Sequence, residues 1–353
     1  MKIMRVLPSM DFGGIERGVY DFSIKASELG HEIIIVSGYG RFIPQLIKNK
    51  NIRWYNLPLE KKNILNFFKG RKKLLKIIKK EIPDIIHVQS RFPSWIICSL
   101  KSKLENIPVV TSIHSIYPFY LYSQSTGKGD LVIVVSKFLE EYAIKKLKVN
   151  INKIRLVYNG ISDEFSRIEK TKKEKIVIGM IGRFTKSKGW FYFLEAVKDL
   201  YYENKYDFET ILIGSGSKSY EKKIKKWIEK NNLSKKIKIL KCNSIDGLKL
   251  IDLLVIPSIK AEGFGRTVVE GQFAKVPVIA SNIGAIPELI EDSKTGFLVS
   301  PKDSISIAEK IKYLMNNPEV IEKITDNAYK FVKENFSVDK MVEKTLNVYK
   351  ELL

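Results

Sequence analysis

The sequence predicts an α/β protein with two doubly wound domains, each built on a parallel sheet. Short β-branched runs alternate with longer segments of helical periodicity along the chain. The apolar runs are nearly continuous, as in strands that are buried on both faces of a parallel sheet. They fall into two series that a polar segment separates, and the length of 353 residues suits two domains of ordinary size.

The predicted strands follow one another at the spacing that intervening helices require. The first series comprises Lys2–Leu7, Glu32–Ser37, Asn51–Asn56, Asp84–Gln89, Val109–Ile113, Leu131–Val135 and Ile154–Val157. The second series comprises Ile176–Ile181, Thr210–Ile213, Lys236–Lys241, Leu253–Pro257, Val278–Ala280 and Gly296–Val299. Many of these strands end at a small or polar residue, where the ligand crevice lies in open parallel sheets.

The polar segment from Ile161 to Lys175 is predicted to link the two domains. We therefore expect a first domain over residues 1–165 and a second over residues 166–336, with a ligand cleft between them. The tail over residues 337–353 is predicted to form an amphipathic helix that docks on another element, because its apolar residues recur near helical spacing. These residues are Val338, Met341, Val342, Thr345, Leu346 and Tyr349.

Composition limits the partners and the compartment. The net charge of +22 favours an anionic partner such as nucleic acid, anionic lipid or a phosphorylated substrate, although a solvated lysine-rich surface is the alternative. Two cysteines in no metal spacing suggest a reducing compartment, and three histidines are too few for a His-rich zinc site. The first residues do not resemble a signal peptide, and no apolar run reaches the roughly 18 residues of a transmembrane helix. A cytoplasmic protein, or one peripheral to a membrane, is expected.

The strongest motif lies at residues 257–271 and reads PSIKAEGFGRTVVEG. Gly263 and Gly265 would let backbone N–H groups approach a ligand, and a helix that begins near Arg266 would point its N-terminus at an anionic group. Glu262 and Glu270 can each accept hydrogen bonds from the vicinal hydroxyls of a sugar or ribose. The alternative is a helix-capping loop with two surface glutamates.

Two other glycine-bounded turns follow predicted strands. In the turn at 182–189, Arg183 can bind phosphate oxygens in a fork and Lys188 can add a point charge, so together they could stabilise a leaving diphosphate. A solvated basic turn is the alternative. The turn at 13–18 is of a phosphate-binding type but lacks the spacing G-x-G-x-x-G. The second strand also lacks the acidic residue that binds an NAD ribose, which argues against an oxidoreductase.

Taken together, these motifs resemble glycosyltransferase family 4, the retaining GT-B transferases also called glycosyl transferases group 1. The resemblance covers nearly the whole chain, and the order of the motifs is specific. The matching segments are the glycine pair at 13–14, GRFTKSKG at 182–189, IGSGS at 213–217, PS…EGFG…E at 257–270, PVIAS at 277–281, IGAIPELI at 283–290 and GFLV at 296–299. Gly271 departs from the pattern, since the family usually has alanine there.

The resemblance implies a GT-B fold of two Rossmann-like domains with an interdomain cleft, in which the first domain binds the acceptor and the second binds the nucleotide sugar. It also implies that the tail helix packs back on the first domain. The implied site residues have separate roles. Glu262 and the backbone of Gly263, Phe264 and Gly265 would hold the donor sugar, and Glu270 would hold the ribose. Arg183 and Lys188 would hold the diphosphate, together with the N–H groups of Thr267 and Val268. Gly13 and Gly14 would close over the phosphates, and His114 would lie beside the sugar.

The implied activity is transfer of a hexose or related sugar, with retention, from a nucleotide-diphosphate donor to a glycan or lipid-linked acceptor in surface polysaccharide or lipopolysaccharide biosynthesis. Because the chain has no D-x-D motif, we expect neither a metal nor another cofactor. Arg183, Lys188 and a helix N-terminus would instead meet the charge of the leaving group. A sugar phosphorylase or nucleotide-sugar epimerase of the same fold is the alternative. A basic nucleic-acid-binding protein is a weaker one, because no zinc-finger or RNA-binding motif is present.

The segment Asn63–Lys80 combines apolar and aromatic residues with many lysines. A basic amphipathic segment of this kind can lie on an anionic leaflet, which would make a membrane surface a partner and place the enzyme on the inner face of the membrane. The alternative is an ordinary helix that covers a sheet and holds its lysines in solvent. A basic first domain would suit a lipid-linked oligosaccharide or a lipopolysaccharide intermediate.

Overall fold

The structure is a computed structural model that describes residues 1–353 apart from residues 12, 61, 105, 118–120 and 172. Phe12 of the first glycine-rich turn and Lys172 of the predicted linker therefore lie outside the described residues. The chain divides into two compact units. Unit 1 comprises Met1–Gly160 and Val338–Leu353, and unit 2 comprises Ile161–Ser337. Each is considered by itself.

Unit 1 contains a seven-stranded parallel sheet in the order β3-β2-β1-β4-β5-β6-β7. Its strands are β1 (Lys2–Ser9), β2 (Glu32–Gly38), β3 (Ile52–Asn56), β4 (Ile85–Gln89), β5 (Val109–Ile113), β6 (Leu131–Val134) and β7 (Ile154–Leu156). Its helices are α1 (Gly14–Glu28), α2 (Ile43–Leu46), α3 (Ile64–Glu81), α4 (Arg91–Leu100), α5 (Lys137–Lys145) and α12 (Val338–Lys350).

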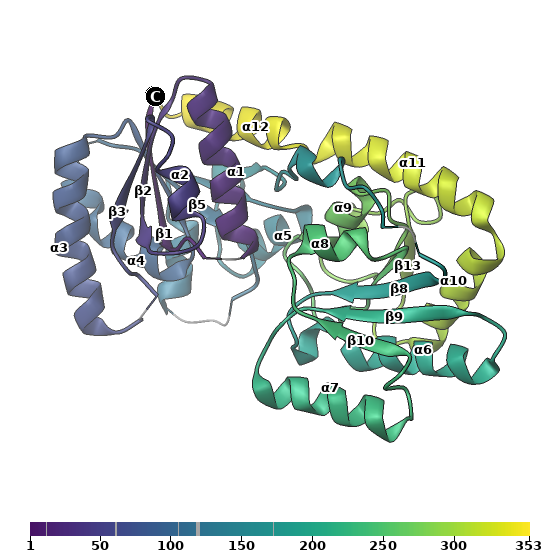
Figure 1. Cartoon of the computed structure of the whole chain (residues 1–353). Helices are drawn as coiled ribbons and strands as arrows, with labels where there is room; N and C mark the ends of the chain where they lie inside the picture. Colours follow the sequence, from purple (N-terminus) through teal and green to yellow (C-terminus); the bar gives the residue numbers. More distant parts are fainter. Residues whose placement is uncertain (12, 61, 105, 118–120, 172) are drawn as a thin grey trace. The chain divides into compact units, whose positions relative to one another are not determined.

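Alternation along β1 separates two cores in unit 1. Ile3 and Leu7 pack in a cluster with residues of α1 and α12, whereas Met4 and Val6 pack in a cluster with residues of α3 and α4. The sheet is therefore covered on both faces (Figure 1). Because both faces are buried, the strands read as continuous apolar runs in the sequence.

Unit 2 contains a six-stranded parallel sheet in the order β10-β9-β8-β11-β12-β13. Its strands are β8 (Ile176–Ile181), β9 (Phe208–Ile213), β10 (Ile237–Leu240), β11 (Leu253–Ile256), β12 (Val278–Ser281) and β13 (Phe297–Val299). Its helices are α6 (Trp190–Glu203), α7 (Lys218–Lys230), α8 (Ser244–Lys249), α9 (Arg266–Phe273), α10 (Ser304–Asn316) and α11 (Pro318–Asn335). Every predicted strand is present, and the predicted fold class of two doubly wound parallel-sheet domains is confirmed.

The segment predicted to be a linker is instead packed on unit 2. The amide of Ile161 donates to the Phe336 carbonyl at 2.7 Å, and Phe165 is buried. Residues 161–165 therefore belong to unit 2, whereas the sequence analysis placed them in the first domain. Two of the lysines that made the segment look like a solvated linker, Lys170 and Lys173, donate hydrogen bonds to main-chain carbonyls, whereas Lys175 forms an exposed ion pair with Asp207.

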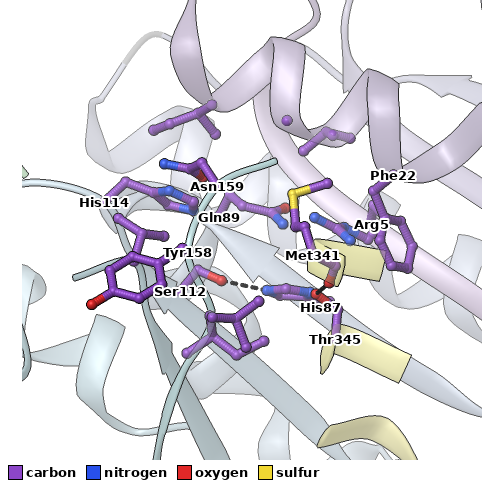
Figure 2. Close-up of a pocket in the computed structure, with 16 residues that line it drawn as sticks. Arg5, Phe22, His87, Gln89, Ser112, His114, Tyr158, Asn159, Met341 and Thr345 are labelled. Atoms are coloured by element: carbon purple, nitrogen blue, oxygen red, sulfur yellow. Dashed lines mark hydrogen bonds between the residues drawn. The ribbon is translucent and has the colours of Figure 1, made fainter. Parts of the chain in front are cut away.

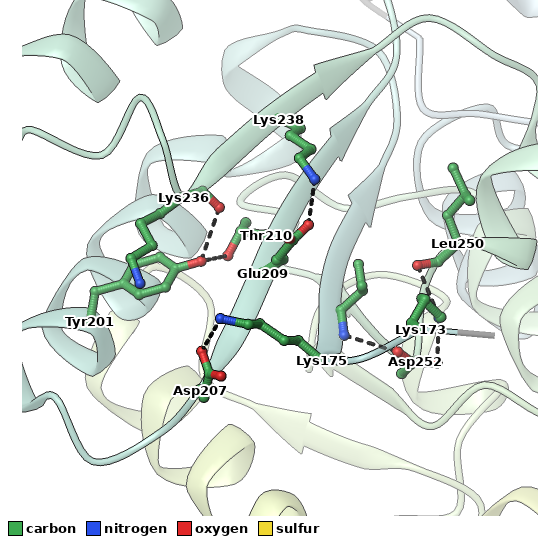
Figure 3. A network of polar contacts seen from close by, with 11 residues as sticks. Lys173, Lys175, Tyr201, Asp207, Glu209, Thr210, Lys236, Lys238, Leu250 and Asp252 are labelled. Carbon is green, nitrogen blue, oxygen red and sulfur yellow. Dashed lines mark hydrogen bonds and ion pairs between the residues drawn. The ribbon is translucent and has the colours of Figure 1, made fainter. Parts of the chain in front are cut away.

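Two of these lysines bind the end of α8 and the start of β11. Lys170 Nζ donates to the carbonyls of Leu248 and Ile251, both at 2.7 Å. Burial lowers the pKa of Lys170 to about 8. Lys173 Nζ donates to the Leu250 carbonyl at 3.1 Å and pairs with Asp252 at 2.5 Å (Figure 3). A lysine side chain can donate hydrogen bonds from its ammonium group to main-chain carbonyls in this way, although a lysine in the sequence is typical of an exposed surface.

Helix α12 packs within unit 1. Val342, Leu346 and Tyr349 are buried in the same core as residues of α1. Lys25 on α1 forms an ion pair with Asp339 at 2.8 Å. The amphipathic helix predicted for the tail is therefore present, and its buried side chains complete the core on one face of the first sheet.

Helix α3 contains the basic amphipathic segment. Asn63 caps it by accepting a hydrogen bond from the Asn66 amide, and Phe67, Leu74 and Ile78 are buried against the sheet. The helix therefore covers the sheet, as the alternative interpretation expected. Three large apolar residues near its start stay exposed, namely Ile64 at 59%, Leu65 at 68% and Phe68 at 59%. In the described part of the chain, no helix is long and apolar enough to cross a bilayer.

Candidate active site

The loops at the carboxyl edge of the second sheet are joined to one another by main-chain hydrogen bonds. The strand order reverses between β8 and β11, so the loops after these two strands flank the point where ligands bind in open α/β sheets. The Ile259 amide donates to the Ser187 carbonyl at 2.9 Å, which joins the two loops. The Ala285 amide donates to the Glu262 carbonyl at 3.0 Å, which adds the loop after β12.

Lys188 and Glu262 meet at this edge. Lys188 Nζ lies 2.8 Å from Glu262 Oε1, and the Ser258 hydroxyl donates to the same oxygen. The two charged side chains are only 21% and 19% exposed, so the pair is partly desolvated. The structure thus brings together two residues that lie 74 positions apart in the sequence. Ser258 was not among the predicted site residues, although it lies in the same motif.

The close approach of the two loops depends on Gly189. This residue has a φ of +75°, and a Cβ atom there would lie 1.8 Å from the Pro257 carbonyl oxygen. Backbone cannot move away as a flexible side chain can, so only glycine fits. Gly284 has a similar role with a φ of +63°, because a Cβ there would lie 2.6 Å from the Glu262 amide nitrogen.

Arg183 lies in the turn that follows β8, and its side chain is exposed. The indole of the buried Trp190 donates to the Arg183 carbonyl at 3.0 Å. The main chain at this position is therefore fixed, while the guanidinium extends into solvent and is available to an anionic ligand.

Helix α9 contains the remaining predicted residues of unit 2. Gly265 lies at its N-cap with a φ of +102°. Glu270 is only 6% exposed and accepts a hydrogen bond from Arg266 Nε at 2.8 Å. The sequence analysis did not single out Arg266 as a partner of Glu270, although the spacing of four residues on a helix allows such a pair.

One prediction for α9 needs correction. Val268 was predicted to offer its amide to the diphosphate, but that N–H already donates to the Gly265 carbonyl at 2.9 Å. The first turn of α9 closes tightly after the left-handed Gly265, and this closure uses the amide. Thr267 lies in the same turn, while Gly263 and the buried Phe264 lie in the loop before it.

Gly271 allows α9 to lie close to the sheet. A Cβ atom at this position would lie 2.6 Å from Leu254 Cδ2 and 3.1 Å from Val278 Cγ2. An alanine would therefore push against side chains of β11 and β12. The departure from the family pattern at Gly271 thus has a packing reason in this chain.

Unit 1 contains the other predicted site residues. Gly13 is the N-cap of α1 and Gly14 its first residue, and the Gly13 carbonyl accepts from the Arg17 amide at 2.9 Å. His114 follows β5 and lines a cavity of about 30 Å³. Both of its ring nitrogens are buried and have no partner among the described residues. Burial, aided by Arg5, lowers the pKa of His114 to about 4, so the ring is neutral at pH 7.

A chain of polar side chains beside this cavity was not predicted. Arg5 Nη1 donates to the Tyr349 hydroxyl at 3.2 Å, and the Tyr349 hydroxyl lies 2.5 Å from His87 Nδ1. His87 Nε2 contacts the Ser112 hydroxyl (Figure 2). Burial raises the pKa of Tyr349 to about 12 and, together with Arg5, lowers that of His87 well below its usual value. The phenol therefore keeps its hydrogen and the imidazole is neutral.

The only sequence signal for this chain was an arginine in the middle of an apolar strand. The ring of His87 is buried, and both of its nitrogens have hydrogen-bond partners. With regard to metals, no group of three or more His, Cys, Asp or Glu side chains that could hold an ion is found in the described residues.

Comparison with known proteins identifies the family. Residues 12–165 match the family described as Glycosyltransferase Family 4, and residues 161–331 match the one described as Glycosyl transferases group 1. An uncharacterized glycosyltransferase of Methanocaldococcus jannaschii is 31% identical, over 100% of this chain and 99% of its own length. The chain belongs to the group 1 glycosyltransferases. The second match begins at residue 161, which is also the first residue of unit 2.

Two further relatives support the assignment of this chain to the group 1 glycosyltransferases. The crystal structure of a glycosyltransferase from Rickettsia africae is 30% identical, with a TM-score of 0.89 over 99% of this chain and 98% of the other. The Escherichia coli enzyme named UDP-Gal:alpha-D-GlcNAc-diphosphoundecaprenol alpha-1,3-galactosyltransferase is 26% identical, over 88% of this chain and 84% of its own length. The two Rossmann-like units match those of GT-B glycosyltransferases.

Proposed function

We propose that this glycosyltransferase moves a hexose or related sugar, with retention, from a nucleotide-diphosphate donor to a glycan or lipid-linked acceptor in surface polysaccharide or lipopolysaccharide biosynthesis. The observation that carries the proposal is the pair of Lys188 and Glu262 where the strand order of the second sheet reverses. A cation for phosphate and a carboxylate for sugar hydroxyls lie side by side there, at 2.8 Å.

The diphosphate leaving group acquires negative charge as the glycosidic bond breaks. Lys188 and the exposed Arg183 would stabilise this charge, helped by the N-terminal turn of α9. In the structure Lys188 is paired with Glu262. A bound diphosphate would take over the ammonium, and the carboxylate would then accept hydrogen bonds from the sugar hydroxyls. No step in this scheme needs a metal ion.

Glu270 is proposed to accept hydrogen bonds from the ribose of the donor. Arg266 Nε donates to Oε1 of this carboxylate, and Oε2 is the proposed acceptor for a ribose hydroxyl. The Escherichia coli relative takes UDP-Gal according to its name, so a UDP-sugar is the first donor to test on this chain.

A nucleotide-sugar panel scored by thermal shift tests the proposed donor. A bound donor stabilises the native state, by about 2.7 kcal/mol at a hundredfold excess over its Kd. We expect a UDP-sugar to raise the melting temperature more than GDP-, ADP- or dTDP-sugars do. Glu270→Gln should reduce this shift, while Glu351→Gln, an exposed glutamate on unit 1, should leave it unchanged. If no nucleotide sugar stabilised the protein, the proposed function would be rejected.

The same donor then separates transfer from the alternative reactions of this fold. A phosphorylase would use inorganic phosphate as acceptor and release a sugar phosphate, and an epimerase would change the sugar without an acceptor. We expect neither product, and we expect nucleoside diphosphate to appear only when a glycan or lipid-linked acceptor is added.

We also propose that the enzyme works at the inner face of the membrane through α3. Ile64, Leu65 and Phe68 are exposed at the start of this helix, and the lysines of its outer surface would attract anionic headgroups. Sedimentation with vesicles tests this proposal. We expect binding to anionic vesicles that falls with salt and is lost when the three residues are changed to serine. Leu29→Ser, at a similarly exposed leucine on unit 1, is the control. Equal sedimentation with neutral and anionic vesicles would contradict the proposal.

A further inference from the structure

Arg5 is a buried cation, and the described residues supply no carboxylate partner for it. It is 5% exposed in the middle of β1, and its guanidinium carbon lies 4.4 Å from the centroid of the Phe22 ring. Its hydrogen-bond partners are neutral. They are the Tyr349 hydroxyl at 3.2 Å and the Gln89 carboxamide oxygen, which accepts from Nε at 3.1 Å and from Nη2 when it faces the guanidinium. No Asp or Glu is recorded as its partner in the described part of the chain.

The guanidinium has donors to spare. Of the five N–H groups of an arginine, Tyr349 and Gln89 account for three. The structure records no acceptor for the others among the described residues. A buried guanidinium cannot lose its proton to reduce the cost of desolvation, so a negative charge in contact with it is strongly favoured.

The hydrogen-bond chain beside Arg5 directs a further donor to the same place. Because Arg5 can only donate, Tyr349 accepts from it and can give its own hydrogen to His87 Nδ1. The remaining N–H of the neutral imidazole, on Nε2, then donates to the Ser112 hydroxyl oxygen. The Ser112 hydrogen has no recorded acceptor within the described residues.

These donors converge on one small cavity. Arg5, Gln89, Ser112, His114 and Asn159 all line it, and its volume is about 30 Å³ (Figure 2). The two ring nitrogens of His114 are buried there without a protein partner among the described residues. The lining is thus rich in donors and contains one fixed positive charge. A cavity of about 30 Å³ has room for one or two waters or for a similarly compact ion.

We propose that this cavity of unit 1 is a binding site for a compact monovalent anion, of the size of chloride or formate, held by Arg5 and the Ser112 hydroxyl. The anion neutralises the buried guanidinium and accepts the hydrogen bonds that the protein leaves unpaired. The small volume favours such a compact ion over sulfate or phosphate. Anion binding at this site does not require the proposed transfer reaction, although His114, which lines the cavity, is also the residue that the family resemblance places beside the donor sugar.

Line broadening of the ³⁵Cl NMR signal by the full-length protein tests the site directly. We expect a saturable excess linewidth that bromide and formate displace and that sulfate at equal ionic strength does not. Formate as the stronger competitor would show that the site prefers a carboxylate, and bromide as the stronger one that it prefers a halide. Arg5→Met should abolish the saturable component.

Because the chain has a net charge of +22, the control must exclude diffuse anion binding. Arg167→Met removes an exposed arginine of unit 2 and should keep the saturable component. Ser112→Ala should weaken chloride binding about tenfold, as expected for one hydrogen bond to a charged group, and it keeps the guanidinium even if Arg5→Met fails to fold. A linewidth that does not saturate, or that Ser112→Ala leaves unchanged, would show that the cavity holds only water.

Discussion

Lys188→Ala is expected to lower the turnover number of sugar transfer by about 100-fold or more. In this enzyme the ammonium would meet the charge that develops on the leaving diphosphate, and loss of one such preorganised donor typically costs 10²–10³ in turnover. Initial rates with a UDP-sugar and a glycan acceptor would measure the effect. Arg183→Ala should also lose most activity, because its exposed side chain has the same proposed ligand.

Lys186→Ala is the matched control for this experiment. Lys186 lies in the same turn and is exposed, but the structure records no contact between it and Glu262. We expect its turnover to stay near that of the wild type. The melting temperature of each variant must also be measured, because Lys188→Ala leaves the partly buried Glu262 without its cation. Unchanged turnover in the Arg183→Ala, Lys188→Ala double variant would contradict the proposed role of both residues.

Gly189→Ala is expected to destabilise the protein strongly. The left-handed backbone costs about 1–2 kcal/mol for a residue other than glycine. In addition, the new methyl would lie 1.8 Å from the Pro257 carbonyl oxygen, so the loops after β8 and β11 would have to separate. We expect a total cost of about 3 kcal/mol or more, together with weaker donor binding.

Gly30→Ala separates the backbone cost from the clash. Gly30 has a φ of +83°, close to that of Gly189, but a Cβ there would meet nothing within 4 Å. We expect Gly30→Ala to cost only about 1–2 kcal/mol and to leave donor binding unchanged. Calorimetry of both variants, with donor titrations, gives the comparison. Equal costs for the two substitutions would show that the loops do not need their close approach.

The central strands were predictable because they are buried on both faces. Burial on both faces requires continuous apolar residues, and this pattern is visible in any single stretch of sequence, as in β5 and β8. The linker prediction failed for the opposite reason. Lys170 and Lys173 read as surface residues, and only their distant partners, the carbonyls near the end of α8, show that they are structural.

The predicted residues of the candidate site differ in how far the structure places them together. Lys188 and Glu262 are in contact, and Glu270 lies in the same unit on α9. Gly13, Gly14 and His114 belong to unit 1. Their proposed roles toward the donor stay predictions, as does a ligand cleft between the domains.

The sequence by itself determined the parallel-sheet architecture, the family resemblance and the glycine-rich loops, because each of these depends on residues that are close together along the chain. Only the tertiary structure decided that Lys188 pairs with Glu262, that the amide of Val268 is already bonded, and that Arg5 is buried against Tyr349, 344 residues away. The physical reason is that an ion pair or a buried hydrogen bond forms between atoms within about 3 Å of each other. The fold sets that distance, and no local pattern of residues records it.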